Sequence, residues 1–229
     1  MSQINPDLKK YWNKSFQKVS ENKLPSDYAV KVESEFTRTA KICDLGGSSG
    51  VDALYFVSKG HEVTIVDISD AALDRAKLRA VAVGKADKLN TILDDYSDAT
   101  IPIPDDTYDV VYARLSLHYF NRDTTKKLLL EINKKLKPQG KAYLTFKSPA
   151  DTAELEHLKR TAKEVEPGIF EEEGIIKSRF TKDDLNQLLK EAGISNFEVK
   201  EITEDFVGKN DNIKSGNKQL LLNEVRFSR

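Results

Sequence analysis

Short apolar segments alternate with amphipathic ones through the middle of the chain. Five segments rich in β-branched and other apolar residues predict strands: 41–45, 62–67, 89–93, 108–113 and 142–146. Three stretches with apolar residues on one face predict helices: 51–59, 70–83 (capped by Asp70) and 122–136. Helices that alternate with strands are typical of an α/β fold with a parallel sheet.

The two ends of the chain follow other patterns. Residues 1–24 are polar, but apolar residues recur there at steps of three and four: Leu8, Tyr11, Trp12, Phe16 and Val19. This spacing predicts one amphipathic helix that caps the sheet. At the other end, residues 197–206 and 219–227 alternate in polarity and flank a turn-rich segment, 208–216, which predicts an antiparallel hairpin.

Residues 149–180 interrupt the alternation. A polar helix is predicted over 152–164, and it is followed by a Pro167–Gly168 turn and the acidic run 171–173. We expect this segment to be an insertion that lies over the ends of the strands. Thr181-Lys-Asp-Asp184 resembles a capping box, so the next helix is expected to begin there.

Composition narrows the class of protein. The 229 residues suit one α/β domain over 1–229, and a net charge of −1 gives no general attraction for nucleic acid or for an anionic membrane. Cys43 is the single cysteine, so no internal disulfide forms, and with His61 and His157 expected on the surface the three scattered histidines predict no metal site. Since no early apolar run resembles a signal peptide or a membrane span, we expect a cytoplasmic protein.

The strand at 41–45 leads into a glycine- and serine-rich loop and then a helix, an arrangement that lets backbone approach a nucleoside closely. Counting from Gly46, the third and sixth positions are Ser48 and Val51, so the loop lacks two of the three glycines of the dinucleotide fingerprint. Asp44 lies two residues before Gly46, where it would repel a pyrophosphate and favour a cationic ligand. S-adenosylmethionine, with its ammonium and sulfonium, is such a ligand.

Asp44-Leu-Gly-Gly-Ser-Ser-Gly50 resembles the D-x-G-x-G-x-G first motif of the class I S-adenosylmethionine-dependent methyltransferases, with Ser48 in place of the middle glycine. The resemblance continues through residues 66–69, 102–111 and Leu136-Lys-Pro-Gln-Gly140, and it is greatest for small-molecule enzymes of the tellurite-resistance and thiopurine type. It implies a Rossmann-like three-layer sandwich whose seven-stranded, mostly parallel sheet ends in an antiparallel hairpin.

Cofactor-binding residues are expected at the carboxyl ends of the strands. Asp67, 21 residues after Gly46, is placed to accept from the two ribose hydroxyls, and Asp95 with Tyr96 is expected to face the adenine, with Asp94 as the alternative to Asp95. Asp44 is expected near the ammonium, and Arg114 next to the methionine carboxylate or paired with one of the surface acids. The full cofactor set is Asp44, Gly46, Gly47, Ser48, Gly50, Asp67, Ile68, Asp95, Tyr96, Arg114 and Trp12.

Candidate catalytic residues lie at both ends of the expected acceptor site. His118 and Tyr119 follow the fourth strand, where His118 could act as a base or be structural. Tyr11 and Trp12 could close over the transferred methyl group, because aromatic faces attract a sulfonium, or they could only dock the helix on the sheet. Cys43 lies inside a strand, where it cannot act as a nucleophile.

These residues favour a methyltransferase that acts on a small molecule. The chain lacks the Asn/Asp-Pro-Pro-Tyr signature that many amino-methylating nucleic-acid enzymes carry after the fourth strand, so no nucleic-acid or membrane partner is expected. Two alternatives stay open at this point: a nicotinamide-dependent oxidoreductase, and a methyltransferase-like domain that binds the nucleoside without turnover. The sequence does not determine the acceptor or the oligomeric state.

Overall fold

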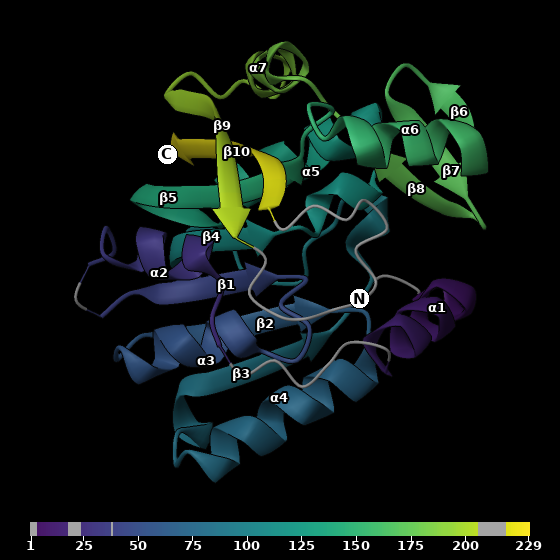
Figure 1. Ribbon diagram of the computed structural model, residues 1–229. Coiled ribbons are helices and arrows are strands. Elements are labelled where there is room, and N and C mark those ends of the chain that lie inside the picture. Colours follow the sequence, from purple (N-terminus) through teal and green to yellow (C-terminus); the bar gives the residue numbers. More distant parts are fainter. Residues whose placement is uncertain (1–3, 18–23, 38, 206–218) are drawn as a thin grey trace.

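A seven-stranded sheet forms the centre of the computed structural model, which describes residues 4–17, 24–37, 39–205 and 219–229 (Figure 1). The order of its strands is β3-β2-β1-β4-β5-β10-β9. The strands are β1 Lys41–Leu45, β2 Glu62–Asp67, β3 Leu89–Leu93, β4 Tyr108–Arg114, β5 Leu136–Lys147, β9 Phe197–Asp205 and β10 Gln219–Ser228. The five expected strands are confirmed, and all five are parallel to their neighbours among them.

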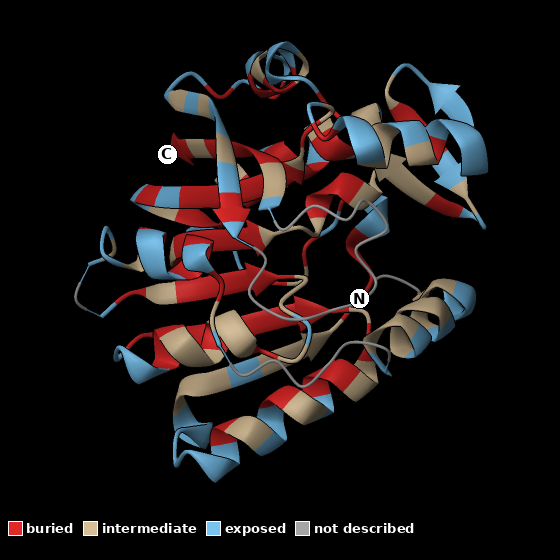
Figure 2. Cartoon of the chain, in the orientation of Figure 1, coloured by how far each residue is buried: buried red, intermediate tan, exposed pale blue. Residues whose placement is uncertain are grey.

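Helices cover both faces of this sheet. On one face, α2 Asp27–Glu33, α3 Val51–Ser58 and α4 Asp70–Ala82 pack on apolar side chains such as Ile42. On the other face, α5 Arg122–Lys135 and α7 Lys182–Glu191 pack on apolar side chains such as Cys43, which follows Ile42 in β1 and belongs to the opposite face. The central strands are therefore buried on both sides (Figure 2), and the expected three-layer Rossmann-like architecture is confirmed.

The antiparallel hairpin expected at the end of the chain is confirmed. β9 and β10 pair antiparallel from Phe197–Phe227 to Asp205–Gln219, and β10 pairs antiparallel with β5. The turn-rich segment 208–216 lies outside the described residues, as do Val19 and Phe206.

The insertion at 149–180 holds a small sheet that the sequence did not predict. Its helix, α6 Thr152–Thr161, is shorter than the predicted 152–164. Three antiparallel strands follow it: β6 Lys163–Glu166, β7 Ile169–Glu172 and β8 Ile175–Ser178. Strands of four residues are too short for a periodicity signal, and the acids in β6 and β7 suggest a loop. In Figure 1 this arm lies on the same side of the molecule as α1 Pro6–Gln17.

Both ends of this insertion are fastened to β10. The Ser148 backbone N–H donates to the Leu221 carbonyl at 3.0 Å, and the Asn223 side-chain amide donates to the Phe180 carbonyl at 2.8 Å. The chain thus leaves the main sheet and returns to it at points that are two residues apart on the same strand.

Two helix starts illustrate what sequence patterns can and cannot settle. Thr181 and Asp184 form the expected capping box at α7, with the Thr181 hydroxyl accepting from the Asp184 N–H at 3.1 Å and the Asp184 carboxylate accepting from the Thr181 N–H at 2.9 Å. At α4, however, Ser69 and not Asp70 is the N-cap, since its hydroxyl accepts from the Ala72 N–H at 3.1 Å.

Burial corrects one expectation and confirms another. His61 is buried, not exposed, because its Nδ1 accepts from the Ala40 N–H at 3.0 Å and its ring lies against Phe36. Cys43 is fully buried, as expected. In the part of the chain that the structure describes, no helix is long and apolar enough to cross a membrane.

Candidate active site

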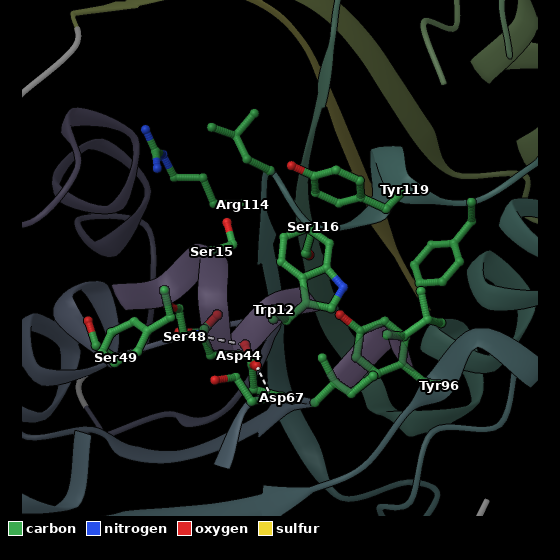
Figure 3. A pocket seen from close by; sticks show the side chains of 18 of the residues that line it. Trp12, Ser15, Asp44, Ser48, Ser49, Asp67, Tyr96, Arg114, Ser116 and Tyr119 are labelled. Atoms are coloured by element: carbon green, nitrogen blue, oxygen red, sulfur yellow. Dashed lines mark hydrogen bonds between the residues drawn. The ribbon is translucent and has the colours of Figure 1, made fainter. Parts of the chain in front are cut away.

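A cavity of about 590 Å³ opens at the carboxyl ends of β1, β2 and β4. Its walls come from the β1–α3 loop, the segments after β2, β3 and β4, the helix α1, and the β7–β8 turn (Figure 3). This size is typical of small-ligand sites. All of the predicted cofactor residues line the cavity except Gly50, which is the N-cap of α3.

The loop after β1 is held so that its backbone lines the cavity. Gly46 has φ +73°, its N–H donates to the Val66 carbonyl at 2.8 Å, and a Cβ on it would overlap Ser116. Ser116 in turn donates from its hydroxyl to the Leu45 carbonyl at 2.7 Å. Glycine is required at this position for both its backbone angle and its close approach to the segment after β4.

Ser48, the departure from the glycine motif, also adopts a left-handed conformation, with φ 49°. Its N–H donates to Oδ2 of Asp67 at 2.9 Å. Ser48 therefore holds, at a cost in backbone strain, a conformation that glycine adopts more easily.

Asp67 ends β2 with both carboxylate oxygens turned to the site. Oδ1 accepts from the Ser69 N–H at 2.8 Å, while Oδ2 accepts from Ser48. Burial raises the pKa of the Asp67 carboxyl, and the backbone donors partly offset that effect. The backbone N–H groups of Ser48 and Ser69 each donate to one oxygen, the Ile68 N–H also faces the carboxylate, and lone-pair capacity remains for a ligand hydroxyl.

Asp44 is buried in β1, and its Oδ2 has no hydrogen-bond partner among the described residues. A Cβ on Gly47 would lie 2.5 Å from that oxygen, so the glycine makes room for the carboxylate. Burial raises the pKa of the Asp44 carboxyl well above its usual range, and the nearby carboxylates of Asp52 and Asp67 raise it further. A cation at this point would stabilise the charged form.

Four residues that the sequence did not indicate join this part of the cavity: Ser26, Asp52, Tyr112 and Glu204. Asp52 accepts from the Ser26 hydroxyl at 2.7 Å and from the Tyr112 hydroxyl at 2.8 Å. Only Asp52 carries a signal, since it lies in the first turn of the helix after the glycine loop. Glu204 comes from a strand more than 150 residues away in the chain, so no local motif points to it.

Arg114 lines the cavity and is paired with Glu204. Its Nε donates to both carboxylate oxygens, at 3.1 and 3.0 Å, and its second terminal nitrogen lies 2.9 Å from Oε2. Burial alone would lower the pKa of the Arg114 guanidinium, but the carboxylates of Glu204 and Asp52 outweigh it and raise that pKa. The predicted pairing of Arg114 with a surface acid is corrected, because its partner Glu204 is buried.

Asp94, Asp95 and Tyr96 line the cavity beyond β3. Asp95 accepts from the Ser97 N–H at 3.0 Å and from the Asn5 N–H at 3.3 Å, so its carboxylate joins the β3 exit to the start of α1. Burial raises the pKa of the Tyr96 hydroxyl, which keeps it neutral. Both acids face the cavity, and the choice between them stays a prediction.

Helix α1 lies over the cavity and places Trp12 in it (Figure 3). The indole of Trp12 meets the ring of Tyr119 edge to face, with centroids 4.6 Å apart. Tyr11, a predicted catalytic residue, packs edge to face on Trp12 but lies outside the cavity lining. Burial raises the pKa of its hydroxyl, and the carboxylates of Glu173 and Glu172 raise it further, which places the β7–β8 turn beside α1.

His118 is also outside the cavity lining. It is buried behind Tyr119, with ring centroids 4.1 Å apart, and its Nδ1 has no hydrogen-bond partner among the described residues. Burial lowers the pKa of His118 well below its usual range, and the cations of Arg179, Lys147 and Lys177 lower it further. Tyr119, in contrast, lines the cavity.

The family described as methyltransferase domain matches residues 9–199. This match covers most of the chain, so the protein belongs to that family. No curated protein matches the sequence.

Solved structures with the same fold include an S-adenosylmethionine-dependent methyltransferase from Methanosarcina mazei, 21% identical with a TM-score of 0.69 over 87% of this chain and 96% of that one. A second is the 1,6-didemethyltoxoflavin-N1-methyltransferase of Burkholderia thailandensis, solved with its 1,6-didemethyltoxoflavin and S-adenosylhomocysteine. It is 17% identical, with a TM-score of 0.61 over 88% and 76% of the two chains.

The protein is therefore a class I methyltransferase, and its cofactor is S-adenosylmethionine. This assignment disfavours the two alternatives that the sequence left open, which were a nicotinamide-dependent oxidoreductase and a domain that binds the nucleoside without turnover.

Proposed function

We propose that the enzyme transfers the methyl group to a small-molecule acceptor by in-line displacement, as in the tellurite-resistance and thiopurine-type enzymes that its sequence resembles. Residues 1–229 act as one methyltransferase domain, with 1–24 as a cap and 149–180 as an insertion over the active site. The observation that carries the proposal is the cavity of about 590 Å³, which has strand-end acids on its inner side and α1 with the β7–β8 turn across its outer side.

The residues present fit the cofactor. The unpartnered, buried Oδ2 of Asp44 is placed for an ammonium group, and Gly46 and Gly47 leave room for a ligand against the loop backbone. Asp67 has acceptor capacity for two ribose hydroxyls, and Asp95 has it for the adenine amine, with Ile68 and Tyr96 as apolar and aromatic neighbours. Arg114 acts through Glu204, since that pair closes the side of the cavity beside Tyr112.

When bound, S-adenosylmethionine supplies a methyl group made electrophilic by its sulfonium. The contribution of the chain is positioning: Trp12, Tyr96 and Tyr119 exclude water and hold a nucleophile in line with the methyl carbon at about 3–3.5 Å. Aromatic faces also attract the sulfonium. Tyr119 is the predicted catalytic residue that touches this space, whereas Tyr11 and His118 act on it through Trp12 and Tyr119.

The proposal is tested by following a labelled methyl group from S-adenosylmethionine into a cell extract that is afterwards separated into small molecules, protein and nucleic acid. We expect the label in the small-molecule fraction, and we expect the Asp67→Asn variant to reduce it strongly. Label that accumulates only in protein or nucleic acid, again dependent on Asp67, would show a macromolecular acceptor and overturn the proposal.

A further inference from the structure

We propose that the acceptor is an uncharged, flat and mainly apolar molecule, such as a neutral aromatic compound, held between α1 and the β7–β8 arm. This inference rests on the proposed function, and it adds the chemical class of the acceptor to it. It starts from the outer wall of the cavity, which we define as Leu8, Trp12, Phe16, Phe120, Ile175 and Ile176.

The outer wall is built from three parts of the chain that are distant in sequence. Leu8, Trp12 and Phe16 recur on one face of α1, Phe120 follows β4, and Ile175 with Ile176 begins β8. Ile176 also packs against the main apolar core, so the β7–β8 arm is anchored and does not merely lie nearby. Aromatic and branched aliphatic side chains converge here from both sides of one space.

No charged side chain joins the outer wall among the described residues that line the cavity. The other residues between α1 and the arm, Ser15, Tyr119, Asn121, Thr124 and Gly174, are neutral. Burial raises the pKa of the Tyr119 hydroxyl to about 12, so it carries no charge near neutral pH.

Four charged residues of the insertion form ion pairs outside the cavity lining. Glu172 pairs with Lys177, and Glu154 pairs with Arg179 and with Lys147 of β5, and none of these five residues lines the cavity. An ionic acceptor held against the outer wall would therefore lose its water next to side chains that, among the described lining residues there, include no counter-ion.

The inner side of the cavity disfavours an anionic acceptor in particular. Among the described lining residues, seven are acids and one is a base. The base is Arg114, and its guanidinium is already paired with Glu204. The acids are Asp44, Asp52, Asp67, Asp94, Asp95, Glu204 and Asp205. An acceptor anion next to this group would be repelled.

Flatness follows from the shape of the aromatic residues. Trp12 and Tyr119 meet edge to face at an interplanar angle of 75°, and Phe120 brings a third aromatic ring to the same space. A planar ring packs well against aromatic rings, either stacked or edge to face, and β-branched Ile175 and Ile176 bound the space from the arm.

Trp12 is the single tryptophan of the chain, so its fluorescence reports binding in this cavity directly. The test titrates three para-substituted toluenes of similar size into protein saturated with S-adenosylhomocysteine: para-cresol, which is neutral, para-toluate, an anion, and para-methylbenzylammonium, a cation. We expect para-cresol to bind at least about tenfold more tightly than either ion. Equal or tighter binding of an ion, or no binding of para-cresol, would overturn the inference.

A charge introduced into the outer wall gives the second arm of the test. In Ile176→Lys, we expect para-cresol to bind about tenfold more weakly and para-toluate to bind more tightly than in the wild type. Val165→Lys is the matched control, because Val165 is exposed on β6 of the same small sheet and does not line the cavity. Ile176→Gln, which adds polarity without charge, should weaken para-cresol binding without favouring para-toluate.

Calorimetry with S-adenosylhomocysteine alone separates this inference from the proposed function. If every variant binds S-adenosylhomocysteine like the wild type but the three probes show no preference for the neutral molecule, the acceptor class is wrong and the methyltransferase site stands. If the wild type does not bind S-adenosylhomocysteine, the site assignment itself fails.

Discussion

The side chain of Asn13 on α1 accepts a hydrogen bond from the hydroxyl of Ser69, the N-cap of α4, at 2.6 Å. Its amide nitrogen also donates to Asp70 at 2.8 Å, and Lys9 one turn earlier lies 2.5 Å from the same carboxylate. Because Ser69 also donates its N–H to Asp67, these contacts connect the cap helix with the acid expected to hold the ribose.

Asn13→Ala should weaken S-adenosylhomocysteine binding about three- to tenfold, since two hydrogen bonds that hold α1 over the site are lost. Thermal stability should change little, because α1 buries none of its residues fully. Calorimetric titration measures the first effect and a melting curve the second. Lys10→Ala, at an exposed position of the same helix, is the control, and equal affinities for the two variants would contradict a role for Asn13.

Asp67→Asn should weaken S-adenosylhomocysteine binding by about ten- to hundredfold, because charge-assisted hydrogen bonds to the ribose are lost. The amide also places an NH₂ where the carboxylate accepts from Ser48 or Ser69, so the loop is expected to loosen. Asp98→Asn is the matched control, because Asp98 is exposed and lies outside the cavity lining. Unchanged affinity in Asp67→Asn would remove this residue from the site.

Asp44 predicts a pH dependence whose sign can be worked out. A carboxyl with a raised pKa in the folded state keeps its proton where the unfolded chain has released it. The free energy of unfolding of the cofactor-free protein should therefore fall as the pH rises from about 4 through the raised pKa. Denaturant unfolding at several pH values should show this loss in the wild type and a smaller one in Asp44→Asn.

The same group should make cofactor binding release protons, because an ammonium next to Asp44 favours its charged form. Titrations in buffers of different ionisation enthalpy measure that release. Its persistence in Asp44→Asn would assign the proton to another group.

His118→Gln should leave kcat within about threefold of the wild type, since the ring lies behind Tyr119 and outside the cavity lining. Its lowered pKa means that the unfolded chain binds a proton below about pH 6.5 while the folded protein does not. Acid should therefore destabilise the wild type more than the variant, by up to about 1.4 kcal/mol per pH unit. His157→Gln on α6 is the control, and a large fall in kcat for His118→Gln alone would indicate a base.

Ser48→Gly should raise the free energy of unfolding by about 0.5–1 kcal/mol, because relief of the left-handed strain exceeds the added freedom of the unfolded chain. The Ser48 N–H that donates to Asp67 is kept, so S-adenosylhomocysteine affinity should hold. Chemical denaturation and calorimetry measure the two quantities. A destabilised Ser48→Gly would show that the side chain contributes more than its backbone angle costs.

The sequence predicted those helices and strands that are long enough to show a clear pattern of apolar and polar residues. β2 begins and ends at the expected residues because Glu62–Asp67 is a β-branched run between two turn signals. The three strands of the insertion were missed because each has four residues and two carry acids. α2 was missed because its signal is a single Ser26 cap before seven residues.

The site was predictable where strand ends converge and not where distant segments meet. Asp44, Asp67 and the pair Asp94 and Asp95 could be placed at the cavity because they lie near the carboxyl ends of parallel strands, which meet at one edge of the sheet. Glu204 reaches the cavity through an antiparallel strand added later in the chain, and His118 is turned away from the cavity although it neighbours Tyr119. Side-chain direction in a short helical turn depends on packing that a local pattern does not contain.

The insertion meets the main sheet at Ser148 and Phe180, which are hydrogen-bonded to residues two positions apart on β10. A change in the length of that arm would therefore enter and leave the fold at a single strand, and the arm reaches the cavity through Gly174, Ile175 and Ile176. Asp44 and Asp67 come from β1 and β2, whose neighbours in the sheet include β3 and β4, so an exchange of the arm would leave their strands in register.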